Sequence, residues 1–478
     1  MALSSPVYLL FVTAVWLALR IIPGIRPRKY LLLAASLLFY ALFDLRFLAL
    51  LLLLCVVAYG LGFAIHRGRW AGALALAGIA FSLTILAIFK YLAVWIYTVS
   101  RMLPSGSGMG QFDPSGWLFP VGISFYTFQA ISYLVDIYRR RMEPVRDPAD
   151  FGLYLVFFPK IVAGPIVRPA DFFRDIPAGP QPAGRKDMPD IFSLFLRGLF
   201  KKVVIADALA GMAGVGFQAA AMPGTSLFAA PVYWRSFYLF AFQIYADFSG
   251  YTDIARASAK LLGIPLPENF RYPYFAPSIT EFWNRWHMSL TQWFREYVFF
   301  PLNRGLLTSF RRVGSAIVQT ATTIFTMLLI GLWHGAGLTY LAWGLWHGVL
   351  LSIDKLWNGK PGSPWRRILS AVIVFHLVGI GWVLFRSETI PAAARFFEGM
   401  VAGGQGFLLA ECILPVLAAG IAIGLIDLPG LRVFPPAFLS LKWFRAVASI
   451  AAATMVGALW LMNWAAGGAG MPFIYTSF

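Results

Sequence analysis

Two histidines, His334 and His347, stand in the same short sequence, Leu-Trp-His-Gly, thirteen residues apart. Both lie in stretches apolar enough for a membrane interior, where ionisable side chains are costly and usually functional. Gly335, Ala336 and Gly337 follow His334 and predict the end of a helix, whereas His347 lies inside the next apolar run. An imidazole at a helix end is better placed for proton transfer, so His334 is the first catalytic candidate. We expect His347 to pack or to form a hydrogen bond.

A third histidine, His287, lies in the sequence EFWNRWHMSLTQWFREY. At helical spacing it shares one face with Glu281, Asn284 and Thr291, while aromatic residues occupy another face. This pattern fits either an amphipathic helix at the membrane interface or a site that uses His287. The residues by themselves leave both interpretations open.

The remaining two histidines have simpler interpretations. His66 lies beside Arg67 and Arg69 at the end of an apolar run, which predicts an interfacial position. His376 lies within an apolar run without a charged neighbour. We expect it to be a neutral imidazole that is hydrogen-bonded to a neighbouring helix.

The chemistry that suits a lone histidine is general-base catalysis, because its ordinary pKa is about 6.5. Such a base takes the proton from an acceptor hydroxyl as that oxygen attacks an activated acyl group. Donors such as Asn284 or indole N–H groups would stabilise the oxyanion. The sequence contains no Gly-x-Ser-x-Gly, His-Glu-x-x-His, Walker A or Cys-x-x-Cys pattern, so serine-nucleophile, zinc and P-loop chemistry are not indicated.

Polar residues gather between residues 243 and 304, among many aromatic residues. Pro265, Pro267 and Pro273 forbid one continuous helix through this window. Irregular backbone at membrane depth survives only where protein or a water-filled cavity surrounds it, so we expect the site here. The candidates for substrate binding or tunnel lining are Asp247, Ser249, Tyr251, Asn269, Asn284, Trp286, Arg295 and Tyr297, together with Trp333 beside His334.

The elements that must position these residues are membrane-spanning helices. Of the 478 residues 59% are hydrophobic and 13% are charged, which is typical of a polytopic membrane protein and predicts an all-α fold with about 11 spans. The polar-rich segments 150–167 and 281–300 are expected to enter the membrane and return as re-entrant helices. The apolar runs are 7–24, 30–43, 47–65, 74–98, 117–137, 190–218, 226–246, 315–333, 336–354, 368–385, 407–427 and 443–466.

The net charge of +18 fits membrane topology better than nucleic-acid binding, because the basic residues gather in short loops. Lys201 and Lys202 are among these predicted cytoplasmic clusters, and both termini are then expected outside. The basic residues follow the first apolar run, which argues for a retained span instead of a cleaved signal peptide. The Gly/Ser/Pro-rich loop 101–116 is expected to be an external turn. Cys55 and Cys412 are expected to pack in the core.

Five stretches closely resemble the membrane-bound O-acyltransferase (MBOAT) family, in its bacterial polysaccharide branch. They are WLFPVGISFYTFQAISYLVDIYR (117–139), FFPKIVAGPIVRPADF (157–172), IYADFSGYTDIA (244–255), the segment around FWNRWHMSL (282–290) and LIGLWHGAGLTYLAWGLWHG (329–348). The resemblance implies one transmembrane domain over 1–478. Its catalytic core is 117–386, with peripheral N-terminal spans in 1–100 and further spans in 400–478.

The same resemblance implies roles for two histidines: His334 aligns with the histidine regarded as catalytic, and His287 with a second family histidine. It implies a funnel-shaped core around a central tunnel in the bacterial inner membrane, surrounded by lipid and without a bound cofactor. An acyl thioester, acetyl-CoA in this branch, would enter from the cytoplasm. A periplasmic SGNH-like acetyltransferase or a polysaccharide such as alginate would accept the acetyl group.

Other functions remain open from the sequence. FWNRWHMSL also resembles the D-alanyl branch, which acts on teichoic acids, and peptidoglycan or cellulose acetylation systems share these motifs. From other classes, a transporter would use His334 as a proton relay, and a scaffold would only hold a periplasmic enzyme. A transporter should show two corresponding broken segments, whereas this chain has one polar region in its middle.

Overall fold

The computed structural model describes residues 2–92, 95–96, 119–176, 179–222, 228–310, 312, 314–356, 363–402 and 409–431. Within these ranges every regular element is a helix, which confirms the predicted all-α class for this part of the chain. The predicted external turn at 101–116 and the predicted span at 443–466 lie outside the described residues.

The contacts within the chain divide it into two compact units. The first comprises Val7–Met188 and Ser258–Pro267, and the second comprises Ala2–Pro6, Pro189–Ala257 and the residues from Glu268 onward. That residues 1–478 form one domain stays a prediction.

The helices include long apolar segments and several short ones. Those before residue 188 are α1 (Pro6–Ile21), α2 (Ile25–Ala41), α3 (Leu45–His66), α4 (Ala71–Ala87), the π-helical η1 (Ile88–Leu92), α6 (Ile123–Tyr138), α7 (Pro148–Val156), α8 (Phe158–Ile161) and α9 (Pro169–Asp175). Those that follow are α10 (Met188–Leu199), the π-helical η4 (Phe200–Asp207), α11 (Ala208–Ala221), α12 (Ala230–Leu262), the 3₁₀ turn η5 (Pro273–Phe275), α13 (Ile279–Trp283), α14 (Met288–Phe294), the π-helical η6 (Arg295–Phe299), α15 (Phe300–Ser309), α16 (Ser315–His334), α17 (Leu338–Leu356), α18 (Pro364–Arg386), α19 (Ile390–Gly399) and α20 (Leu409–Leu431).

Five helical segments in the described residues are long and apolar enough to cross a membrane, which takes roughly 20 residues. Each coincides with an apolar run of the sequence from which a span is predicted, so the chain is a polytopic membrane protein. The segments are Leu45–His66, Ala71–Leu92, Met188–Ala221, Ser315–His334 and Pro364–Arg386.

For one span, the predicted end lies too early in the sequence. The apolar run 226–246 corresponds to α12, which continues to Leu262 and has 33 residues. The polar residues Asp247 and Asp253 are tolerated in this helix because each forms ion pairs with lysine side chains. The helix ends at Leu262; the next residue, Gly263, has a φ of 87°, which favours glycine, and Pro265 prevents continuation of the helix.

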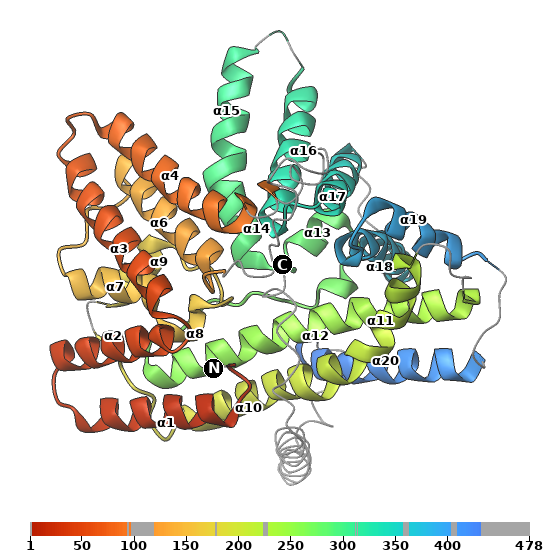
Figure 1. Cartoon of the computed structure of the whole chain (residues 1–478), viewed down its shortest axis with the longest axis horizontal. Helices are drawn as coiled ribbons and strands as arrows, with labels where there is room; N and C mark the ends of the chain where they lie inside the picture. Colours follow the sequence, from red (N-terminus) through yellow and green to blue (C-terminus); the bar gives the residue numbers. More distant parts are fainter. Residues whose placement is uncertain are drawn as a thin grey trace, which may run out of the picture. The chain divides into compact units, whose positions relative to one another are not determined.

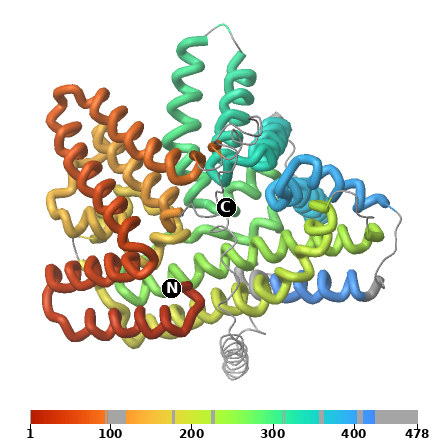
Figure 2. The backbone as a smooth tube through the Cα atoms, in the orientation of Figure 1, coloured from red at the N-terminus to blue at the C-terminus, as the bar shows by residue number. Residues whose placement is uncertain are grey.

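In the first unit, α3, α4 and α6 lie side by side (Figure 2). Gly62 and Gly78 permit this approach, because a Cβ on Gly62 would lie 2.7 Å from the Tyr133 ring and one on Gly78 would lie 2.6 Å from Leu134. Cys55 on α3 is buried as predicted, and so is Cys412 on α20, which belongs to the second unit. The segment 150–167, predicted to be re-entrant, is built from the short helices α7 and α8.

In the second unit, α16 and α17 form a tightly packed pair next to one another (Figure 1). Glycines make the contact: a Cβ on Gly331 would collide with the carbonyl oxygen of Tyr340, and one on Gly344 with that of Met327. Small residues at such positions let two helices approach to backbone contact. This pair carries both Leu-Trp-His-Gly sequences and determines how their histidines lie.

Candidate active site

His334 is the last residue of α16, where the sequence predicts a helix end. Gly335 is extended, with φ of −175°, and α17 begins at Leu338, so the chain breaks at the Gly-Ala-Gly sequence. The imidazole is buried, with 4% of its surface exposed. Its ring centroid lies 4.6 Å from that of Trp333 and 5.1 Å from that of Trp343. The first catalytic candidate is therefore held among aromatic rings at a helix terminus.

His347 lies on α17 and is fully buried. Its ring centroid is 5.0 Å from that of Trp343, which also contacts His334 edge to face at 87°. The two Leu-Trp-His-Gly sequences therefore place their histidines against the same indole ring. The break after His334 reverses the chain, so the angle expected in one continuous helix does not apply.

His287 lies between α13 and α14, at the N-terminal cap of α14. Its backbone has φ of 41° and ψ of 54°, a left-handed conformation that is uncommon for residues other than glycine. Ser278 caps α13, since its hydroxyl accepts from the Glu281 N–H at 3.1 Å. The assumption that these residues lie on one short helix is wrong, because the chain turns at His287 between α13 and α14.

Asn269 holds His287 in place. The backbone N–H of Met288 donates to the Asn269 carbonyl oxygen at 2.9 Å, and the backbone N–H of Ser289 donates to Asn269 Oδ1 at 3.0 Å. The Nδ1 of His287 lies 3.3 Å from the same Oδ1. Because an amide oxygen only accepts hydrogen bonds, this contact places the proton on Nδ1 and leaves the lone pair on Nε2.

Aromatic rings connect the histidines. Trp333 lies with its centroid 6.2 Å from that of His287 and 4.6 Å from that of His334, so one indole ring contacts both imidazoles. Phe248 contacts His287 edge to face at 4.6 Å, and Phe385 contacts His334 at 5.0 Å. Two imidazoles in an apolar aromatic setting can exchange protons with a hydroxyl and a leaving group, while the rings exclude water.

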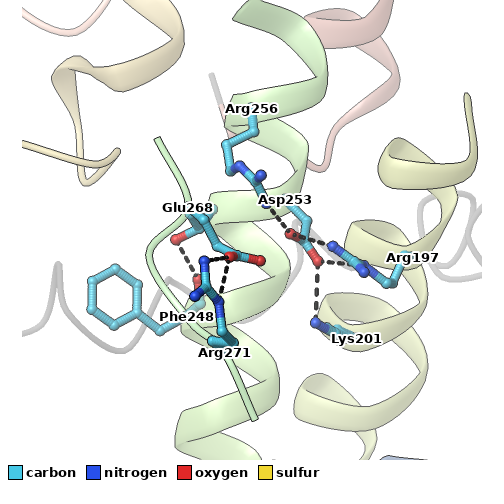
Figure 3. Close-up of polar contacts among 8 residues, drawn as sticks. Arg197, Lys201, Phe248, Asp253, Arg256, Glu268 and Arg271 are labelled. Carbon is cyan, nitrogen blue, oxygen red and sulfur yellow. Dashed lines mark hydrogen bonds and ion pairs between the residues drawn. The ribbon is translucent and has the colours of Figure 1, made fainter. Parts of the chain in front are cut away.

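A cluster of charges lies on α10, η4 and α12 (Figure 3). The Asp253 carboxylate accepts two hydrogen bonds from Arg197, at 2.9 and 3.0 Å, and one from Lys201 at 3.1 Å. Arg256 lies 3.5 Å from the same carboxylate. Asp253 is buried, so three cations surround one carboxylate inside the second unit. The cluster fastens α10 and η4 to α12, which carries Phe248.

A second ion-pair group, centred on Lys202, lies beside the first. Its ammonium group is 2.9 Å from Asp207 and 2.7 Å from Asp247. Lys201 and Lys202 are buried in η4, so the prediction that they lie in a loop is wrong, while their side of the membrane stays a prediction. An apolar run can contain such residues where carboxylates on a neighbouring helix compensate them.

Of the nine residues predicted to bind substrate or line the tunnel, six are buried, Tyr297 is half-buried, and Asn284 and Arg295 are exposed. Trp286 is buried against Trp382, and Tyr297 packs on Trp293. Asn284 and Arg295 are exposed, and no contact found in the described residues brings either to a histidine. The predicted residues buried in the second unit are Asp247, Ser249, Tyr251, Asn269, Trp286 and Trp333.

Some contributors were not identified from the sequence. Trp343, Phe248 and Phe385 contact the histidines, and Ser289 shares the amide oxygen of Asn269. Aromatic residues are so frequent in this chain that none of these rings carried a distinguishing signal. Only their contacts separate them from ordinary packing residues.

The comparisons with known proteins agree on one family. The sequence profile described as MBOAT, membrane-bound O-acyltransferase family, matches residues 32–359. A probable alginate O-acetylase AlgI of Pseudomonas syringae pv. tomato is 38% identical over 415 residues, 85% of this chain and 76% of the relative. A peptidoglycan O-acetyltransferase of Helicobacter pylori is 32% identical, over 78% of this chain and 74% of its own length. A teichoic acid D-alanyltransferase of Bacillus subtilis is 31% identical, over 56% of this chain and 69% of its own length.

Proposed function

Since this chain belongs to the membrane-bound O-acyltransferase family, we propose that it transfers acetyl groups to an exported polysaccharide such as alginate. The donor is a cytoplasmic thioester, acetyl-CoA, and no cofactor is bound. The observation that carries the proposal is that His287 and His334 both contact the indole ring of Trp333. The share of the chain matched by the alginate O-acetylase supports the choice of acceptor.

The proposed mechanism uses His334 as the general base. It takes the proton from the acceptor hydroxyl while that oxygen attacks the carbonyl carbon of the thioester. The carbon–sulfur bond then breaks, and the thiolate leaves with a proton returned by a histidine. His287, with its lone pair on Nε2, is the second imidazole available for these transfers. The aromatic rings around both histidines keep water from competing with the acceptor.

The same proposal gives the chain a place in the cell. It is a multi-pass protein of the bacterial inner membrane, with about 11 spans and re-entrant helices around a central tunnel. Both termini lie on the periplasmic side. A periplasmic SGNH-like acetyltransferase or the polysaccharide itself takes the acetyl group at the outer end of the tunnel.

A second acceptor is supported by a specific observation. The D-alanyltransferases match only 55% and 56% of this chain, whereas the peptidoglycan O-acetyltransferase matches 78%. Acetyl transfer to peptidoglycan is therefore the alternative with more support than D-alanyl transfer to teichoic acid.

The test of this function is chemical analysis of the cell envelope. A strain that lacks this gene is compared with the same strain carrying it, and base-labile acetate and D-alanine are measured on the exported polysaccharide and on peptidoglycan. We expect the gene to restore acetate on the polysaccharide. Acetate on peptidoglycan alone would support the second acceptor, and D-alanine or no ester at all would contradict acetyl transfer.

Replacement of Asn269 by alanine is expected to lower acyl transfer about tenfold, the effect of losing one hydrogen bond that orients a catalytic group. The Asn269 side chain fixes both the turn at Ser289 and the proton of His287. The measurement is ester content per amount of folded protein. Gln292→Ala is the matched control, since Gln292 is an exposed amide on α14 and its removal should change little. Equal effects of the two variants would argue against a positioning role for Asn269.

A further inference from the structure

The second Leu-Trp-His-Gly sequence contributes a histidine that the proposed mechanism does not use. His347 is fully buried, and neither Nδ1 nor Nε2 has a hydrogen-bond partner in the described part of the chain. Within the described residues, the indole Nε1 atoms of Trp283 and Trp343 also have no hydrogen-bond partner. Both indole rings contact the imidazole, with centroids 5.3 Å and 5.0 Å away. Three touching side chains thus carry buried nitrogens that the fold does not satisfy.

His376 shows what a histidine looks like when its role is structural. Its Nδ1 lies 2.8 Å from the carbonyl oxygen of Val372, and its Nε2 lies 3.0 Å from the hydroxyl of Tyr238 on α12. That arrangement confirms the predicted hydrogen bond to a neighbouring helix. His347 has only ring contacts, including Phe282 stacked at 11°. A phenylalanine would make the same contacts without burying unpaired nitrogens, so packing does not require an imidazole at this position.

Two of the three side chains present their nitrogen-bearing edges to the same residue, Gly381 on α18, and one of them, Trp343, also contacts the candidate base. A Cβ on Gly381 would lie 2.7 Å from His347 Nε2 and 3.4 Å from Trp343 Cδ1, the carbon next to Nε1. The Nε2 atom and the N–H edge of Trp343 therefore face the same side of α18. The same Trp343 ring contacts His334 at 5.1 Å.

Helix α13 is held so that Trp283 completes this group. The backbone N–H of Thr280 donates to Asp354 on α17 at 2.9 Å, and the Thr280 hydroxyl donates to the same oxygen at 2.5 Å. These two hydrogen bonds fix α13 against α17, the helix that carries His347. Two hydrogen bonds at the start of α13 and the packing of the aromatic rings thus position the side chains of Trp283, Trp343 and His347.

We propose that His347, Trp283 and Trp343 bind one neutral hydroxyl oxygen, from water or from an acceptor alcohol, beside His334. Indole N–H groups only donate, so the ligand must accept a hydrogen bond. A neutral imidazole presents one N–H and one lone pair, so a ligand that both donates and accepts hydrogen bonds suits either tautomer of His347. A hydroxyl does both, whereas a carboxylate cannot donate and a buried charge would lack a counter-ion. The inference rests on the proposed function, because the hydroxyl is placed next to the base that would activate it.

The first test separates hydrogen bonding from packing at position 347. His347→Phe keeps the ring contacts and is expected to unfold at an unchanged or higher temperature in detergent. Its ester yield should fall by about tenfold or more, as for one lost hydrogen bond to a reacting group. His347→Gln keeps a donor and an acceptor and should restore most of the yield. His376→Phe is the matched control, expected to lower the unfolding temperature with unchanged ester per folded protein.

Wild-type ester in His347→Phe, or equal losses in the Phe and Gln variants, would overturn the inference. Should His347→Phe fail to fold, a high-resolution map of the wild-type protein decides instead. An oxygen within hydrogen-bond distance of His347 and an indole nitrogen supports the site, and its absence overturns it. High-resolution maps recorded with and without a trisaccharide from the exported polymer separate the two sources of the bound oxygen. A water molecule is present in both maps, whereas an acceptor alcohol is present only in the map with the trisaccharide. If the wild-type protein forms no ester, the proposed function fails, while the maps still test the site.

Discussion

Alanine in place of His334 is expected to reduce acyl transfer by roughly 10²–10⁴-fold, the usual contribution of a positioned general base. The side chain ends α16 and is held between Trp333, Trp343 and Phe385. Alanine has no group that could take the proton from the acceptor hydroxyl. The measurement is ester-linked acetate on the exported polymer, divided by the amount of folded protein in the membrane.

The control for this variant is His66→Ala. His66 lies at the end of α3, where the Arg140 guanidinium donates to its carbonyl oxygen at 2.8 Å. That backbone contact survives the substitution, so ester yield should stay near wild type. Undiminished ester in folded His334→Ala would remove His334 from the mechanism. Lost ester with unchanged polymer export would exclude the transporter interpretation.

Replacing Asp253 by alanine is expected to destabilise the protein by about 3–5 kcal/mol, the typical cost of removing one partner from a buried ion pair. Arg197, Lys201 and Arg256 would then face one another without their shared carboxylate. The Lys201 side chain is only 6% exposed, so water cannot replace the lost partner. The measurement is the midpoint of unfolding in detergent, together with the amount of protein that accumulates in membranes.

Asp171→Ala provides the matched control, because its ion pair with Arg174 is exposed, with side-chain exposures of 56% and 67%. Such surface pairs contribute about 0–1 kcal/mol, so this variant should unfold near the wild-type midpoint. Asp253→Asn should fall between the two, since it keeps the shape and an acceptor but loses the charge. Similar midpoints for Asp253→Ala and Asp171→Ala would show that the buried cluster does not stabilise the fold.

The positions of the helices could be predicted from the sequence because they depend on local composition. The apolar runs 47–65 and 315–333 predict α3 and α16 to within a few residues. The glycines after His334 likewise predict the helix end, since a glycine-rich break needs no distant partner. The hydrogen bond of His376 was predicted because an imidazole within an apolar run requires a partner.

Predictions failed where a residue depends on a partner far along the chain. Lys202 looks like part of a cytoplasmic basic cluster until Asp247, forty-five residues later, is seen beside it. The turn at His287 is similar, because the hydrogen bonds that Asn269 accepts from Met288 and Ser289 overcome the helical periodicity of the surrounding residues. In both cases the stabilising contact joins residues that are far apart in the sequence, so a local sequence pattern does not predict it.

The sequence by itself determined the class of protein, the helical segments and the three histidines that are worth testing. It indicated that His334 and His287 act together and that His347 only packs or forms a hydrogen bond. The tertiary structure placed all three around Trp333 and Trp343 and left His347 without a hydrogen-bond partner in the described residues. The physical reason is that apolar periodicity along the sequence indicates which residues enter the membrane. The packing of α16, α17 and the α13–α14 turn decides which of those residues come into contact.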